Sequence, residues 1–388
     1  MSSTVKILGG YSSAGEHTTE ARDAGVQLPV SPYKMRKGGK SLFKLMEKEG
    51  VREIRFHFNP KTKLKAILAI DFIPNKRDEK GKLKDISVDG GTRFSHKTEE
   101  DALKDAVRLA RAMTRKTNVL NAKEGGAKAV VLSTNKKTKK FLESIGDFIQ
   151  IQGGFFKTAI DLGFNLNDAH IIHTKTDYID SLDSHLDNGL GSTGETTAQG
   201  IASSLKIVSK KFLKKELKLC TIAIQGLGAV GMNLAFKLKK IGCVVIASDI
   251  KKELCNTAKK KGIIIVNPNK ILYQKVDILS PCAFGGIINK NTIKKLRCKI
   301  VAGGANNQLE NELKDEKRLL KRKIIFIPDF ILNSGGFLQA LVERKGGNLN
   351  EAAKETKIIS LQLVKTINYA KKNNCTLLEA AIKLFDKK

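Results

Sequence analysis

Short, continuously apolar runs alternate with longer amphipathic stretches through the second half of the chain. The apolar runs lie at 219–225, 243–248, 263–266, 276–280, 299–302 and 324–327, and helical spacing occurs at 229–241 and 251–261. Strands of parallel sheets are buried on both faces and are therefore apolar throughout, whereas the helices that cover them carry one apolar stripe. The pattern predicts an α/β domain over 191–334, entered by a helix at 195–210 and followed by helices in 335–388.

The first half of the chain has a different pattern. Residues 53–58 alternate between apolar and polar side chains, 59–62 have the composition of a turn, and 64–72 read as the returning strand of a hairpin. The other predicted elements are helices at 41–49, 98–116 and 136–152 and strands at 128–133 and 156–161. We expect these elements to form a second α/β domain over 39–190.

Three further segments complete the predicted organisation. Residues 1–38 are rich in Gly, Ser and Thr and are predicted to form a flexible arm, and 74–85 are predicted to form an exposed loop. Apolar residues at helical spacing in 358–367 predict a long amphipathic helix. We expect the helices of 335–388 to pack back on the first domain.

Two lysines flank a glycine pair within 113–128. Lys116 closes a predicted helix, Gly125 and Gly126 read as a turn, and Lys128 opens the next strand. Two ammonium groups held together in a cleft repel each other, and burial disfavours both charges. One can then act as a base near neutral pH while the other binds an acid. The alternative is a solvated loop in a lysine-rich chain.

A glycine-rich turn directly follows the apolar run 219–225. Gly226, Gly228 and Gly231 form a G-x-G-x-x-G pattern that opens the next helix. Glycines there permit a tight turn, close approach of a pyrophosphate and close packing of helix on strand, and the helix N-terminus faces the phosphates. Asp249 ends the following strand, where a carboxylate binds both ribose hydroxyls and repels a 2′-phosphate. These features predict a Rossmann domain that binds NAD in preference to NADP.

Composition and net charge bear on whether the protein binds nucleic acid. Hydrophobic residues make up 41% of the 388 positions and charged residues 28%, as in ordinary soluble proteins, but the net charge is +31. The lysines are spread along the whole chain, Trp is absent and aromatic content is 6%, which leaves little material for base stacking. We therefore expect no nucleic-acid partner and attribute the charge to lysines on exposed faces.

The cysteines, the histidines and the lengths of the apolar runs indicate the cellular compartment and whether a metal site or a membrane span is expected. The six cysteines contain no C-x-x-C pair and several lie in apolar runs, as expected of reduced thiols in a cytoplasmic protein. His170 and His173 form an isolated H-x-x-H without a third ligand nearby, so we expect no metal site. The N-terminus has no apolar signal region and no apolar run reaches 18 residues, so we expect neither secretion nor a membrane span.

Ten separated segments together resemble the Glu/Leu/Phe/Val (amino-acid) dehydrogenase family, closest to its leucine dehydrogenase branch. In chain order they are 90–93, 112–116, 125–128, 158–161, 176–178, 226–231, 281–283, 305–309, 328–329 and 333–336. The resemblance implies an α/β substrate domain and a Rossmann domain with a cleft between them. It also implies reversible, NAD-dependent oxidative deamination of an L-amino acid to its 2-oxo acid and ammonia.

The resemblance also implies a role for individual residues. Lys116 would bind the substrate α-carboxylate, Lys128 would be the low-pKa acid/base, and Asp161 would move protons to and from the amino group. Other substrate contacts are implied for Gly90, Gly91, Asp89, Ala159, Asn333, Phe337 and Ala340. Cofactor contacts are implied for Gly226, Gly228, Ala229, Val230, Gly231, Asp249, Thr197, Cys282, Ala283, Asn306 and Asn307.

Asp89 departs from the family pattern. The leucine-type branch has an apolar residue at this position, and the glutamate branch has a lysine that binds the acidic side chain. A carboxylate favours a substrate with a basic or hydrogen-bond-donating side chain. Alternatively, the loop at 74–85 turns Asp89 away, or a nearby lysine pairs with it. Phe337 is larger and Ala340 smaller than the family's usual residues, so the side-chain pocket is expected to differ as well.

The leading hypothesis is therefore an NAD-dependent L-amino acid dehydrogenase for a leucine/valine-type substrate or one with a basic side chain. The resemblance implies a homo-oligomer, a dimer or higher. Because the C-terminus stops earlier than the family's usual tail, which often carries subunit contacts, we favour a dimer over the family's usual large oligomer. The alternative is a non-catalytic, NAD-binding regulatory protein of the same fold. The joint presence of Lys116, Lys128 and Asp161 argues against it.

Overall fold

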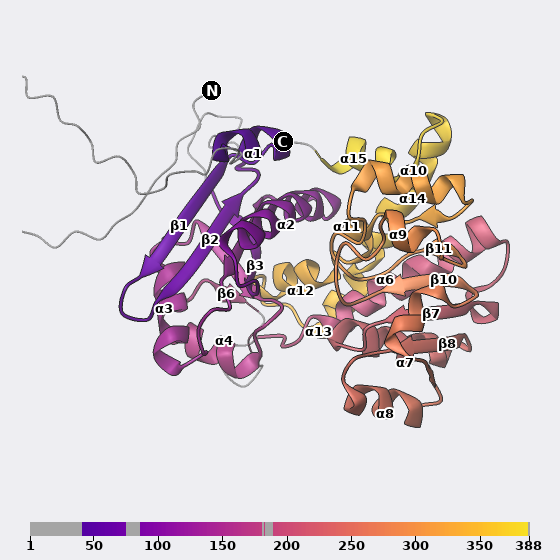
Figure 1. Cartoon of the computed structure of the whole chain (residues 1–388), viewed down its shortest axis with the longest axis horizontal. Helices are drawn as coiled ribbons and strands as arrows, with labels where there is room; N and C mark the ends of the chain where they lie inside the picture. The colour runs from indigo at the N-terminus through magenta and orange to yellow at the C-terminus, as the bar shows by residue number, and fades with distance from the viewer. Residues whose placement is uncertain (1–40, 75–85, 181, 183–188, 387–388) are drawn as a thin grey trace, which may run out of the picture.

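The computed structural model describes residues 41–74, 86–180, 182 and 189–386. These residues form two lobes that lie side by side in Figure 1, each built on a six-stranded sheet. The predicted N-terminal arm and the loop at 75–85 lie outside the described residues. Within the described part of the chain, no helix combines the length and the apolar character needed to cross a bilayer.

The first sheet is mixed. Its strand order is β1-β2-β4-β3-β5-β6, with antiparallel pairing among β1, β2 and β4 and parallel pairing among the rest. The strands are β1 (Glu53–Asn59), β2 (Leu64–Ile70), β3 (Val88–Phe94), β4 (Gly125–Val131), β5 (Phe156–Ile160) and β6 (Ile179–Asp180). Its helices are α1 (Leu42–Glu49), α2 (Glu99–Val119), α3 (Lys139–Gln150) and α4 (Leu166–His173).

Strand β2 shows how the sequence pattern produces two cores. Leu64, Leu68 and Ile70 join the core beneath α3 and α4, while Ile67 and Ala69 join the core beneath α1 and α2. Successive side chains of a strand point to opposite faces, so a fully apolar strand is buried on both. The first sheet is therefore covered by helices on both sides.

Two glycine pairs lie inside central strands of this sheet. The expectation that Gly125 and Gly126 form a turn is wrong, because both belong to β4. A Cβ on Gly126 would lie 2.2 Å from the backbone nitrogen of Thr114, so only glycine lets α2 pack this closely on the strand. Strand β3 was not predicted, since Gly90 and Gly91 interrupt its apolar pattern.

The second sheet is entirely parallel, with the order β12-β11-β10-β7-β8-β9. The order reverses between β7 and β10, and such a reversal opens a crevice at the carboxyl ends of the strands. The strands are β7 (Thr221–Gln225), β8 (Val244–Ser248), β9 (Ile264–Ile265), β10 (Val276–Pro281), β11 (Cys298–Val301) and β12 (Ile325–Phe326). The helices are α6 (Gly194–Val208), α7 (Ala229–Ile241), α8 (Lys252–Lys260), α9 (Lys290–Ile293), α10 (Glu312–Lys321) and α11 (Asp329–Leu332). Shorter segments are η1 (Ser209–Leu213), η2 (Leu217–Leu219) and η3 (Pro268–Tyr273).

The C-terminal helices belong largely to the second lobe. They are α12 (Gly335–Glu343), α13 (Leu349–Glu355), α14 (Lys357–Lys372) and α15 (Leu377–Phe385). Ile359 of α14 and Leu378 of α15 lie in the same core as the parallel sheet. The expectation that this segment packs back on the first domain is therefore wrong for α14, whose apolar face is buried against α6. Helix α15 also contacts α2, so it bridges the lobes.

Gly126→Ala should lower the free energy of unfolding by about 3 kcal/mol, because the added methyl group collides with the backbone of α2 at Thr114. Denaturant unfolding measures the change. Gly228→Ala is the matched control, since a Cβ there would meet no atom within 4 Å. Equal stability of the two variants would contradict the packing described for α2 and β4.

Candidate active site

A cavity of roughly 220 Å³ lies between the lobes, and every residue for which a catalytic or substrate-binding role was predicted lines it. From the first lobe, its lining includes Asp89, Gly90, Gly91, Lys116, Lys128, Ala159 and Asp161. From the second lobe and the C-terminal helices, it includes Thr197, Val230, Asn306, Asn333, Phe337 and Ala340. Residues as far apart in sequence as Asp89 and Ala340 thus meet at one place.

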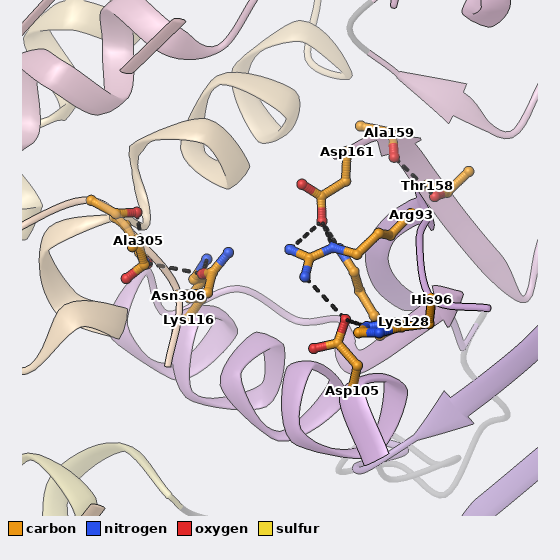
Figure 2. Close-up of polar contacts among 12 residues, drawn as sticks. Arg93, His96, Asp105, Lys116, Lys128, Thr158, Ala159, Asp161, Ala305 and Asn306 are labelled. Atoms are coloured by element: carbon orange, nitrogen blue, oxygen red, sulfur yellow. Dashed lines mark hydrogen bonds and ion pairs between the residues drawn. The ribbon is translucent and has the colours of Figure 1, made fainter. Parts of the chain in front are cut away.

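Lys128 and Asp161 form the centre of the site. The Lys128 ammonium lies 2.5 Å from Oδ2 of Asp161, and the same oxygen accepts a hydrogen bond of 3.1 Å from Nε of Arg93 (Figure 2). Lys128 projects from β4, Arg93 from β3, and Asp161 follows β5. One carboxylate is therefore held by two cations from neighbouring strands.

Arg93 extends this network away from the cavity. Its Nη1 donates to Oδ2 of Asp105 on α2 at 3.0 Å, and Nε2 of His96 lies 2.9 Å from the same oxygen (Figure 2). The backbone of His96 has a φ of +63°, a left-handed conformation that is uncommon outside glycine. Arg93 belongs to the segment 90–93 that carries the family resemblance, but no local pattern identifies its partners Asp161 and Asp105.

Lys116 contacts the opposite lobe. Its ammonium donates to Oδ1 of Asn306 at 2.7 Å, and Nδ2 of Asn333 donates to the same oxygen at 3.0 Å. Figure 2 shows this pair set apart from the Lys128 network. The Oδ1 atom of Asn333 is buried and has no hydrogen-bond partner among the described residues, which leaves an acceptor beside the cavity.

Both lysines have lowered pKa values. Burial is the main cause for each, and repulsion from Lys128 also contributes at Lys116, whose pKa falls to about 8. Burial outweighs the opposing effect of Asp161 on Lys128, and Arg93 lowers the pKa of Lys128 further. Although burial opposes its ionised form, Lys128 and Arg93 together hold the pKa of Asp161 far below its usual range. The site thus contains an ionised carboxylate, which can take up a proton, beside an amine that can lose one.

Gly91 makes room for this arrangement. A Cβ on Gly91 would lie 2.6 Å from Nζ of Lys128 and 3.2 Å from Cβ of Asp161. Its neighbour Gly90 faces the adjacent strand, where a Cβ would lie 1.8 Å from the carbonyl oxygen of Ala127. The two positions therefore require glycine for different reasons. Gly91 leaves space in the cavity, and Gly90 permits the strands to pair.

The predicted dinucleotide turn joins β7 to α7. Gly226 has a φ of +95°, and a Cβ on Gly231 would lie 2.0 Å from the carbonyl oxygen of Gly226. A Cβ on Gly228 would meet nothing within 4 Å, and no side chain caps the N-terminus of α7, which begins with Ala229 and Val230. Open space in front of uncapped N–H groups fits a pyrophosphate.

Of the other residues predicted to contact the cofactor, Asp249 and Ala283 lie beside this turn. Asp249 accepts from the backbone nitrogen of Leu227 through Oδ2 at 2.7 Å, which fixes the carboxylate at the end of β8 beside the glycines. Gly226 also closely approaches Ala283, next to the partly buried Cys282. Asn307 does not line the cavity, and its φ of +51° instead shapes the loop that presents Asn306.

Asp89 is neither turned away nor paired with a lysine. Its carboxylate accepts two hydrogen bonds from Arg344, of 2.9 Å from Nη1 and 2.5 Å from Nη2, and Arg344 also donates to both oxygens of Asp180. All three residues line the cavity. Arg344 and Asp180 were not predicted as site residues, because Arg344 is 255 positions from Asp89 and no local pattern connects them.

Comparisons with known proteins agree with the geometry. Residues 84–177 match the model of the Glu/Leu/Phe/Val dehydrogenase dimerisation domain, and 248–384 match that of Glutamate/Leucine/Phenylalanine/Valine dehydrogenase. Leucine dehydrogenase of Bacillus subtilis (strain 168) is 33% identical over 355 residues, covering 89% of this chain and 93% of the relative. Phenylalanine dehydrogenase of Lysinibacillus sphaericus is 35% identical over 302 residues, covering 75% and 79%.

Among solved structures, L-tryptophan dehydrogenase from Nostoc punctiforme is similar with a TM-score of 0.68 and 31% identity. The match covers 89% of this chain and 97% of that one. The relatives carry names for different amino acids, so they agree on the class of reaction and differ in substrate. Together with the site geometry, they show that the chain belongs to the Glu/Leu/Phe/Val dehydrogenase family of NAD-dependent amino acid dehydrogenases.

Proposed function

We propose that this protein catalyses the reversible oxidative deamination of an L-amino acid to its 2-oxo acid and ammonia in the cavity between the lobes. One observation carries the proposal: two buried lysines line the same cavity, one paired with Asp161 and the other with Asn306. Burying an amine costs folding free energy. Groups with perturbed pKa values that converge in a cleft are typical of catalytic sites.

Lys116 is proposed to bind the α-carboxylate. Its ammonium is held at the cavity by Asn306, so it can receive an anion with little reorganisation. The unpartnered Oδ1 of Asn333, which lies beside it, can accept a hydrogen bond from the substrate amino group. These two contacts would fix the substrate Cα and its amino group in one orientation.

Lys128 and Asp161 are proposed to move the protons. When bound, NAD supplies the hydride acceptor, and the oxidised carbon must then gain water and release ammonia. Lys128 in its neutral form would take a proton from that water, and Asp161 would pass protons to and from the amino group. Their direct contact lets a proton cross between the two groups without leaving the site.

The glycine turn and Asp249 are proposed to hold NAD. The open N-terminus of α7 would bind the pyrophosphate, and the carboxylate of Asp249 would bind the adenosine ribose. Thr197, Val230 and Asn306 line the cavity from the same lobe and would border the nicotinamide end. Cys282 and Ala283 would lie between these regions.

The substrate side chain is proposed to occupy the part of the cavity lined by Ala159, Phe337 and Ala340. These residues suit a leucine/valine-type side chain, while Asp89 supports the alternative of a basic one. We also propose that the protein is cytoplasmic and acts as a homo-oligomer, a dimer or higher. The matching dimerisation-domain model and the reduced cysteines support these two points.

Lys128→Ala should reduce kcat by about 10²–10⁴-fold while leaving NAD affinity within about twofold, since Lys128 lies in the first lobe, away from the glycine turn. NADH formation across the twenty amino acids measures turnover, and calorimetry measures NAD binding. Lys123→Ala, an exposed lysine close by in sequence, is the control and should retain activity. Loss of NAD binding in Lys128→Ala would contradict the role given to Lys128. An inactive parent that still binds NAD would instead favour the regulatory alternative.

Arg93→Gln should move the rising limb of kcat/KM against pH to higher pH. Arg93 lowers the pKa of Lys128, so removing its charge raises that pKa, and a higher pH is then needed to produce the neutral amine. Arg93→Lys keeps a cation beside Asp161 and should restore most of the original profile. A fall in kcat without displacement of the limb would show that Arg93 has a purely structural role.

A further inference from the structure

A row of side chains crosses the first sheet beneath the cavity. Gly91 pairs with Ala159 on β5, and Ala159 pairs with Asp180 on β6. On the other side of β3, the register places Lys128 beside Gly91. Paired residues share a face of the sheet. The row therefore runs from the proposed base Lys128, over the small residues Gly91 and Ala159, to Asp180. A substrate lying over Gly91 and Ala159 would therefore direct its side chain toward Asp180.

Asp89 lies on the same face, two positions before Gly91 on β3. Two residues of a strand span roughly 7 Å, and two neighbouring strand spacings roughly 10 Å. Asp89 and Asp180 therefore both lie within reach of an extended amino-acid side chain whose Cα sits near Gly91. Arg344, at the end of α12, reaches this place from the second lobe and binds both carboxylates. We call Asp89, Arg344 and Asp180 the end cluster.

The end cluster has more acceptors than donors. Arg344 has five N–H groups, of which four donate to the two carboxylates. Each carboxylate oxygen accepts one of these bonds and can accept about one more, so about four acceptor positions remain against one donor. Two carboxylates and one guanidinium also leave a formal charge of −1.

Resting on the proposed function, we propose that the end cluster selects L-amino acids whose side chain ends in a hydrogen-bond donor. An ammonium group is favoured most, because it fills acceptor positions and balances the excess negative charge. A neutral amide fills acceptors without balancing the charge. A carboxylate side chain is rejected by like-charge repulsion from Asp89 and Asp180.

Aliphatic side chains are disfavoured for a different reason. The side chains of Arg344 and Asp180 are 18% and 15% exposed. Because both residues line the cavity, a methyl group placed against them would strip water from charged groups and return no hydrogen bond. The wall formed by Ala159, Phe337 and Ala340 suits the methylene groups of a longer side chain whose polar end reaches the cluster.

The test is a comparison of kcat/KM for ornithine, lysine, glutamine, leucine, valine and glutamate, with NAD as the oxidant. Ornithine or lysine should exceed leucine by at least about tenfold, and glutamate should be the poorest substrate. Asp89→Leu combined with Arg344→Leu and Asp180→Leu removes the whole end cluster, so no charged member is left without its partner. This triple variant should lower the ratio of ornithine to leucine by about 10²-fold, with kcat/KM for leucine rising.

The matched control removes a cluster of three charged residues of the second lobe that does not line the cavity, Lys215→Leu with Asp277→Leu and Lys299→Leu. It should leave the substrate ratio unchanged. If the triple variant of the end cluster does not fold, Asp180→Asn keeps the shape, removes one charge and should still lower the ratio of ornithine to leucine.

Two outcomes of the kinetic comparison would overturn the selection by the end cluster. One is a parent enzyme that prefers leucine or valine over every donor-bearing substrate, and the other is a ratio that stays the same in the triple variant or in Asp180→Asn. Absence of NADH formation with every amino acid would instead count against the proposed function. Calorimetric titration of ornithine and leucine into the parent protein tests the selection without turnover, and tighter binding of leucine would reject it.

Discussion

A single carboxylate oxygen shared by two cations organises the reaction end of the cavity. Burying Lys128 or Arg93 alone would cost several kcal/mol, and Oδ2 of Asp161 offsets that cost for both. Each cation comes from a different strand, so the pairing also ties together side chains from β3, from β4 and from the end of β5. Neighbouring residues fit this arrangement. A side chain at position 91 would collide with Nζ of Lys128, so the position holds glycine. Asp105 accepts a hydrogen bond from Nη1 of Arg93.

The two lobes meet through polar contacts on either side of this centre. Lys116 reaches Asn306 of the second lobe, and Arg344 reaches back to Asp89 and Asp180 of the first. Helix α2 is tied to the second lobe by a buried ion pair between Arg115 and Asp386 as well. Charged contacts of this kind are directional, so they define the relative position of two surfaces more sharply than apolar packing does.

Much of the fold followed from local patterns. Continuous apolar runs identified the strands of the second sheet, and the limits of α7 agree with those expected at 229–241. Errors arose where tertiary packing overrides local preference. Gly125 and Gly126 looked like a turn, but they lie in β4 because α2 approaches too closely for any side chain there. The apolar stripe of α14 was recognised, yet the stripe does not specify which core it faces.

The sequence by itself determined the class of protein, since the glycine turn, the paired lysines and the order of motifs all depend on short-range spacing. It also singled out Asp89 as unusual. Only the tertiary structure decided what Asp89 contacts, because Arg344 and Asp180 come from distant parts of the chain and meet it through the pairing of β3, β5 and β6 and the position of α12. Electrostatic partners are chosen by proximity in space, and proximity across 255 residues is a product of folding that local sequence does not encode.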